Sequence, residues 1–137
     1  MSYTVHELQI GQSAEFTKTI SETDVYLFAG VTGDFNPAHV NAQYAEGTFF
    51  KKRIAHGMLS ASLISTVLGT HLPGQGSIYA EQNVRFKAPV YFGDTITAKV
   101  EVEEINIEKN RVKLKTTCTN QDGVLVVDGY AVILPPK

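Results

Sequence analysis

The sequence has little cysteine and no excess of basic residues. Cys118 is the only cysteine among 137 residues, so no disulfide can form within the chain. Lys and Arg together number 12 and Asp and Glu 14, which gives a formal net charge of -2 and no basic surface for a nucleic-acid backbone. The composition argues against a disulfide-stabilised fold and against a nucleic-acid partner.

The chain also lacks a secretory signal and a long apolar run. Residues Met1–Leu8 have neither a basic start nor an apolar stretch, so we expect a cytoplasmic protein. No charged residue occurs between Arg53 and Glu81, but Pro73 and its neighbouring glycines leave only about 14 apolar residues, fewer than the roughly 20 that cross a bilayer. We expect a buried helix here and no membrane partner.

No internal repeat, low-complexity tract or Ser/Pro-rich linker divides the chain. A length of 137 residues with 43% hydrophobic side chains suits one hydrophobic core. Residues 1–137 are therefore predicted to form a single domain.

Alternating hydrophobicity predicts an antiparallel sheet. Apolar and polar residues alternate over 94–104 and again over 111–119, with a polar turn between them, so these two strands should pair. The run 124–134 is more continuously apolar, which predicts a more central strand. Two further strands are expected at 78–87 and 12–20.

One helix is expected to be buried on every side. From Gly57 to Gly69 the residues are small or apolar and uncharged, so a curved sheet must surround them, and we predict an α+β fold with an antiparallel sheet wrapped around a long central helix. A capping box at Ser21–Asp24 predicts a helix through Ala29, and Asn41 can cap another. The interval from Gly30 to Asn41 is predicted to be a loop.

That loop contains an acid and an imidazole, Asp34 and His39. On a continuous helix the two side chains would point about 140° apart, but Pro37 disfavours the helical conformation at Asn36 and allows them to converge. Such a pair can transfer protons at neutral pH. The alternative is an ordinary turn in which Asp34 and Asn36 bond to nearby backbone and His39 only packs.

The start of the buried helix, Ala55-His56-Gly57-Met58, is a candidate oxyanion hole. Free N–H groups and the positive end of the helix dipole favour developing negative charge, and Gly57 lets a ligand approach closely. The alternative is a plain helix start chosen for tight packing. We expect His56 to be structural.

These segments together resemble a known family. Residues 26–40, Tyr-Leu-Phe-Ala-Gly-Val-Thr-Gly-Asp-Phe-Asn-Pro-Ala-His-Val, followed by Ala55-His-Gly-Met, are similar to the signature of the MaoC-like R-specific enoyl-CoA hydratases. The similarity extends to Leu72-Pro-Gly-Gln-Gly-Ser-Ile-Tyr and Phe86-Lys-Ala-Pro-Val-Tyr-Phe-Gly-Asp, and the length resembles the small bacterial hydratases linked to polyhydroxyalkanoate supply.

The resemblance implies a hot-dog fold, a homodimer and reversible syn hydration of trans-2-enoyl-CoA to (R)-3-hydroxyacyl-CoA. It implies that Asp34, His39 and Gly57 are catalytic, and we assign Asn36 to support of the loop. By resemblance, Ser65 and Leu68 line the acyl pocket, although core packing explains them equally well. No cofactor is expected, and the histidines show no metal-ligand spacing.

The sequence leaves open which substrate the protein binds. The segment Lys51–Arg53, with Arg85 and Lys87, could bind CoA phosphates, or Lys51–Arg53 could be a solvated loop. Tyr79, Tyr91 and Phe92 more often indicate core or dimer contacts than adenine stacking. A hot-dog thioesterase, a dehydratase of 3-hydroxyacyl-carrier protein and a non-catalytic acyl-CoA-binding module are the alternative functions.

Overall fold

The computed structural model describes all of residues 1–137, which form one sheet and four helices. The elements in chain order are β1 (Ser13–Thr19), α1 (Glu22–Thr32), α2 (Pro37–Val40), α3 (Ala42–Glu46), α4 (Gly57–Thr70), β2 (Ile78–Phe86), β3 (Thr95–Asn106), β4 (Arg111–Thr119) and β5 (Leu125–Leu134).

The five strands form one antiparallel sheet in the order β1-β3-β4-β5-β2. All five occur where the sequence predicts strands, and the expected antiparallel pairing of β3 with β4 is confirmed. The more continuously apolar β5 is an interior strand with a hydrogen-bonded neighbour on each side, but the prediction that it is more central than β3 and β4 is wrong, because β4 is the middle strand. A continuous apolar run indicates that both faces are covered and does not rank the interior strands. The strands β1 and β2 are the two edges.

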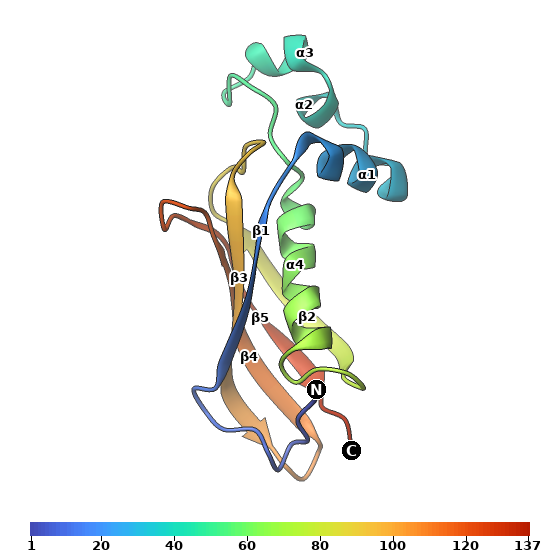
Figure 1. Ribbon diagram of the computed structural model, residues 1–137, viewed down its shortest axis with the longest axis vertical. Helices are drawn as coiled ribbons and strands as arrows, with labels where there is room; N and C mark the ends of the chain where they lie inside the picture. Colours follow the sequence, from blue (N-terminus) through green and yellow to red (C-terminus); the bar gives the residue numbers. More distant parts are fainter.

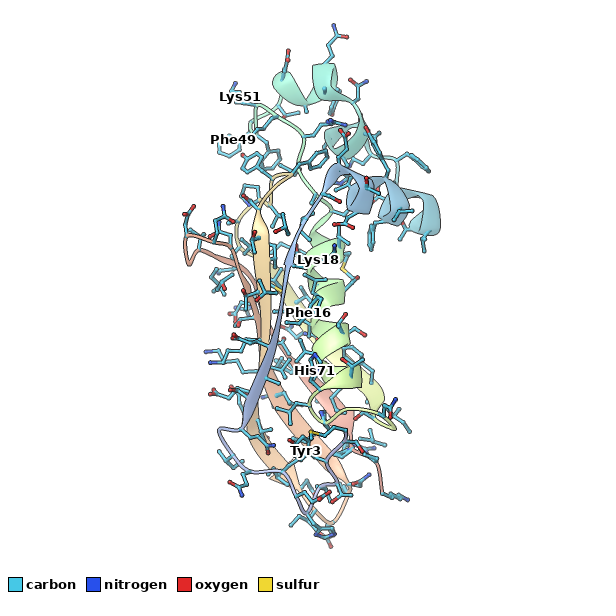
Figure 2. The ribbon with its side chains drawn as sticks, in the orientation of Figure 1. Tyr3, Phe16, Lys18, Phe49, Lys51 and His71 are labelled. Carbon is cyan, nitrogen blue, oxygen red and sulfur yellow. The ribbon has the colours of Figure 1, made fainter.

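The sheet curves around α4, which lies against its concave face (Figure 1). The helix contacts all five strands, and its buried side chains include Ile64, Val67 and Leu68. Inward-facing residues of β3 and β4 complete this core, and Phe16 of β1 packs against its edge (Figure 2). The predicted α+β hot-dog architecture is confirmed. None of the helices combines the length and the apolar character needed to cross a bilayer.

Two predicted helix caps are present. Ser21 Oγ accepts a hydrogen bond from the Asp24 N–H at 3.1 Å, and the Asp24 carboxylate accepts one from the Ser21 N–H at 2.9 Å, which completes the capping box of α1. Asn41 Oδ1 accepts from the Tyr44 N–H at 2.9 Å and so caps α3. Local sequence thus determines where these helices begin.

The prediction of a loop from Gly30 to Asn41 is wrong at both ends. Helix α1 continues to Thr32 and stops at Gly33, whose φ of 80° is the left-handed conformation of a helix C-cap and whose N–H bonds to the Ala29 carbonyl. A short helix, α2, then starts at Pro37, because proline suits the first helical position and Asn36 caps it. Within this interval only residues 33–36 and Asn41 are irregular. Helices α1, α2 and α3 lie beyond the N-terminal end of α4 (Figure 1).

Candidate active site

Asp34 lies in the tight turn between α1 and α2, with its side chain exposed. One carboxylate oxygen accepts a hydrogen bond from the Asn36 N–H at 3.1 Å, and Asn36 Oδ1 accepts from the Ala38 N–H at 3.0 Å. Asp34 and Asn36 therefore form the side-chain bonds to nearby backbone that an ordinary turn predicts, and the bond from Ala38 is consistent with the loop-supporting role assigned to Asn36. The second Asp34 carboxylate oxygen has no hydrogen bond within the chain, so it is open to a ligand or water.

His39 lies in α2 and is 9% exposed. Its Nδ1 donates to the Ile54 carbonyl oxygen at 2.7 Å, and because a carbonyl oxygen only accepts, the hydrogen must be on Nδ1. The Nε2 atom of the neutral ring then carries the lone pair. Burial lowers the pKa of His39 below its ordinary 6.5, with the bond to Ile54 and the charge of Asp34 acting in the opposite direction. The ring is therefore a neutral base at pH 7.

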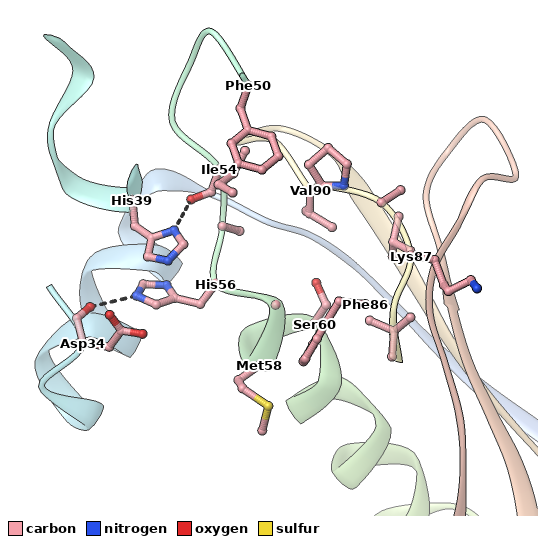
Figure 3. A pocket seen from close by; sticks show the side chains of 16 residues that line it. Asp34, His39, Phe50, Ile54, His56, Met58, Ser60, Phe86, Lys87 and Val90 are labelled. Carbon is pink, nitrogen blue, oxygen red and sulfur yellow. Dashed lines mark hydrogen bonds between the residues drawn. The ribbon is translucent and has the colours of Figure 1, made fainter. Parts of the chain in front are cut away.

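His56 connects the two candidate residues. Its ring stacks on that of His39 with centroids 3.9 Å apart, and its Nε2 donates to the main-chain carbonyl oxygen of Asp34 at 2.9 Å (Figure 3). It is 2% exposed and directly precedes α4. We expected His56 to be structural, and these contacts show how: its side chain holds both the Asp34 turn and the His39 ring against the start of the central helix.

Asp34, His39 and Gly57 line one cavity of about 440 Å³ (Figure 3). Its other walls come from α4, from the end of β2 and the segment after it, and from β5. The remaining lining residues are Phe50, Ile54, Ala55, His56, Met58, Ser60, Phe86, Lys87, Ala88, Pro89, Val90, Val126 and Val127. A largely apolar space with a few polar groups in its wall suits a ligand with a hydrocarbon portion and a polar reacting group.

Gly57 is the first residue of α4 and faces this cavity. The first N–H groups of a helix have no acceptor in their own helix, and they carry the positive end of its dipole. A Cβ at this position would lie 2.6 Å from the Phe86 ring, so the residue must be small for the ring to cover it. The geometry is consistent with the predicted anion-stabilising role, because Gly57 faces the cavity at the start of the helix. It also supports the tight-packing alternative, because the Phe86 ring leaves no room for a larger side chain.

Asp34, His39 and His56 bring three potential metal-ligand atoms within 4.8 Å of one another, a cluster that spacing along the chain did not reveal. The two imidazole rings are stacked with an interplanar angle of 30°, so their lone pairs lie in nearly parallel planes and do not converge on one point. His39 Nδ1 and His56 Nε2 are already bound to carbonyl oxygens. This arrangement suits proton transfer better than tetrahedral metal coordination.

The two predicted acyl-pocket residues lie outside the cavity. Leu68 is 1% exposed in the core, whereas Ser65 is exposed and lines a shallower hollow between α4 and β2 with Tyr79 and Gln82. Positions three apart on a helix differ by about 60° around its axis, and the edge of the covering sheet falls between these two. Their contact with an acyl chain stays a prediction.

The basic segment Lys51–Arg53 lies on the loop between α3 and α4, where Figure 2 shows Phe49 and Lys51 at the end of the molecule near the small helices. Arg53 is engaged within the fold, because it pairs with Glu22, donates to Tyr26 Oη at 2.7 Å and lies over the Phe92 ring. Lys51 and Lys52 are exposed. Of the basic residues singled out, Lys87 alone lines the main cavity.

Sequence reasoning missed most of the cavity wall. Phe50, Phe86 and Val127 belong to three separate segments, and no local pattern relates them. Ser60 was missed as well, although its position three residues after Gly57 places both on one face of α4 and could have indicated it.

The chain is similar to a known family and to proteins with named activities. Residues 6–124 match the family described as MaoC like domain. The chain is 56% identical over 130 residues to the (R)-specific enoyl-CoA hydratase of Rhodospirillum rubrum, covering 95% of this chain and 90% of that one. It is 44% identical over 129 residues to the (R)-specific enoyl-CoA hydratase of Aeromonas caviae, covering 94% and 96%.

A solved structure has the same fold. The unliganded R-hydratase PhaJ1 of Pseudomonas aeruginosa superposes with a TM-score of 0.92 at 51% sequence identity, covering 98% of this chain and 86% of that one. A similarity of this extent includes the strands, the central helix and the segment that carries Asp34 and His39.

Proposed function

The chain belongs to the MaoC-like domain family, and from this membership and the site geometry we propose that it is an (R)-specific enoyl-CoA hydratase. It catalyses the reversible addition of water to a trans-2-enoyl-CoA to give the (R)-3-hydroxyacyl-CoA. The enzyme is a hydro-lyase, and its own side chains and backbone are sufficient for the chemistry described below.

Water activation is assigned to Asp34 and His39. Two hydrogen bonds of about 2.8 Å can join polar atoms up to about 5.6 Å apart through one water, and a carboxylate oxygen of Asp34 lies within 4.8 Å of one ring nitrogen of His39. The exchangeable position on the imidazole is Nε2, since Nδ1 is held by Ile54. The pair removes a proton from the water as its oxygen attacks C3, and a proton is delivered to C2 to complete the addition.

Charge stabilisation is assigned to the start of α4. As the C3–O bond forms, the C2–C3 π electrons move toward the thioester and negative charge develops on its oxygen. The Gly57 N–H and the helix dipole lie at the cavity wall where this oxygen is proposed to bind. Syn addition requires that the proton reach C2 on the same face at which water attacks C3, and in this proposal one pair, Asp34 and His39, serves both steps from one side of the double bond.

The observation that carries the proposal is the meeting of Asp34, His39 and Gly57 around one largely apolar cavity. The test uses purified protein with crotonyl-CoA, following the loss of enoyl-thioester absorbance. The product's chirality is read with dehydrogenases specific for the R or the S alcohol. We expect rapid absorbance loss with only R product.

Other outcomes separate the alternatives. Release of free thiol from saturated acyl-CoA without hydration would favour a thioesterase. Hydration of enoyl-carrier protein but not of crotonyl-CoA or longer enoyl-CoA would favour a carrier-protein dehydratase. Binding of acyl-CoA with neither reaction would leave a non-catalytic binding module and contradict the proposal.

The proposed enzyme is a homodimer paired along β2. This edge strand has β5 as its one neighbour, and large apolar side chains are exposed along it and beside it on α4, namely Met58, Ile78, Tyr79 and Phe86. A second copy would bury this edge, which soluble proteins otherwise protect from aggregation. It would also close the hollow that contains Ser65, and the predicted acyl contact of Ser65 depends on that closure.

Sedimentation equilibrium tests the dimer. We expect a mass of twice the 15.0 kDa chain at micromolar concentration. A single-chain mass at that concentration would contradict the pairing, and it would leave the hydratase assignment to be judged by the crotonyl-CoA assay alone.

A further inference from the structure

The hydroxyl of Ser60 is buried without a hydrogen-bond partner at the cavity wall. Three buried side-chain polar atoms have no partner in the chain, and two of them, Ser60 Oγ and His56 Nδ1, belong to residues that line this cavity. Ser60 is 0% exposed. A buried hydroxyl without a partner destabilises the folded protein, and a ligand oxygen in the cavity would supply the missing partner.

Two other hydroxyls of the same helix are satisfied within the chain. Ser62 Oγ donates to the Met58 carbonyl at 2.7 Å and Thr70 Oγ1 donates to the Thr66 carbonyl at 2.5 Å, each four residues back. For Ser60 the corresponding acceptor would be the His56 carbonyl, but the Ser60 hydroxyl makes no bond to it. Ser60 is therefore distinguished from Ser62 and Thr70 by its burial and its missing partner.

The position of Ser60 relates it to Gly57. Residues three apart share one face of a helix, and helical side chains lean toward the N-terminus, so the Ser60 hydroxyl is directed toward the first turn of α4. Figure 3 shows Ser60 at the start of the helix beside Phe86, whose ring also covers Gly57. An oxygen atom bound at the Gly57 N–H would lie next to this hydroxyl.

We propose that Ser60 is a further catalytic residue, whose hydroxyl donates a second hydrogen bond to the thioester carbonyl oxygen beside the Gly57 N–H. The inference rests on the proposed hydratase function and adds a side-chain donor to its oxyanion hole. The bond strengthens as charge develops on that oxygen, so it stabilises the transition state more than the bound substrate.

Replacing Ser60 with Ala tests the donor. We expect kcat for crotonyl-CoA hydration to fall by about 10²-fold, the usual effect of losing one oxyanion-hole donor, with little change in KM. The unfolding midpoint should stay the same or rise, since Ala removes an unpaired buried polar atom. Ser60→Cys, which is close in shape but a weak donor, should lose most of the rate as well.

Thr70→Val is the matched control, because it removes a hydroxyl of the same helix whose bond is to the Thr66 carbonyl, and Thr70 lines neither the cavity nor the hollow of Ser65. It should keep the parent kcat. A parent rate in Ser60→Ala would overturn the proposal. A loss of rate accompanied by an equal loss in Thr70→Val, or by a lowered unfolding midpoint, would also overturn it, since either result indicates a structural role.

A spectroscopic measurement separates this inference from the hydratase assignment. A conjugated dienoyl-CoA absorbs at longer wavelength when donors polarise its carbonyl, and in an Asp34→Asn background it should bind without rapid turnover. We expect a smaller red shift when Ser60→Ala is added to that background. An unchanged shift would overturn the role of Ser60, whereas a parent protein that does not hydrate enoyl-CoA would overturn the proposed function itself.

Discussion

Replacing Asp34 with Asn should lower kcat for crotonyl-CoA hydration by about 10²- to 10⁴-fold, the usual contribution of general acid–base catalysis. The amide cannot take a proton from water, but its oxygen can still accept the hydrogen bond from the Asn36 N–H. The turn is therefore expected to keep its conformation. Steady-state assays on the purified variant measure the effect.

Two controls accompany this variant. Asp122→Asn makes the same chemical change in the exposed turn between β4 and β5 and should leave the rate unchanged. The unfolding midpoint of Asp34→Asn should match that of the parent, because Asp34 is exposed and forms no ion pair. Turnover near the parent level would end the assignment of Asp34 to water activation.

Replacing Gly129 with Ala should destabilise the fold by about 3 kcal/mol or more. Gly129 lies in β5 between Thr116 of β4 and Val84 of β2. An added Cβ would overlap the Asn83 carbonyl oxygen and lie 2.7 Å from the carbonyl carbon, and neither backbone atom can move without shifting β2. A glycine inside a strand often marks such a close backbone approach. Urea unfolding measures the loss.

Gly69→Ala is the matched control. Gly69 lies in α4 with nothing within 4 Å of an added Cβ, so alanine should raise the unfolding free energy by about 0.5–1 kcal/mol through its better helix propensity. Unchanged stability in Gly129→Ala would mean that β2 can move away from β5 at little cost, which would contradict this prediction.

Local sequence patterns predicted the secondary structure well, because each depends on neighbouring residues. The alternation in β3 and β4 reflects one buried and one exposed face, and the caps at Ser21 and Asn41 are bonds between residues three apart. The prediction for Gly30–Asn41 was wrong because Gly33 and Pro37 are typical both of turns and of helix ends. Gly33 and Pro37 can each end or begin a helix, and the sequence pattern does not rank these choices.

The candidate site was predictable only in part. Asp34 and His39 are five residues apart, so the turn at Asn36 and Pro37 was enough to suggest that they converge. The contact of His56 with both depends on how the loop before α4 packs, 22 residues farther along the chain from Asp34. The different burial of Ser65 and Leu68 also depends on packing, since the edge of the sheet decides which helical positions are covered.

The strands, the buried central helix, the helix caps and the pairing of an acid with an imidazole could be predicted from the amino-acid sequence, because periodicity and short-range hydrogen bonds are local properties. Which groups face one another across the cavity depends on the packing of segments that are far apart in the chain. The lowered pKa of His39, the unpaired hydroxyl of Ser60 and the cover of Phe86 over Gly57 result from burial by distant segments, and burial depends on packing among those segments.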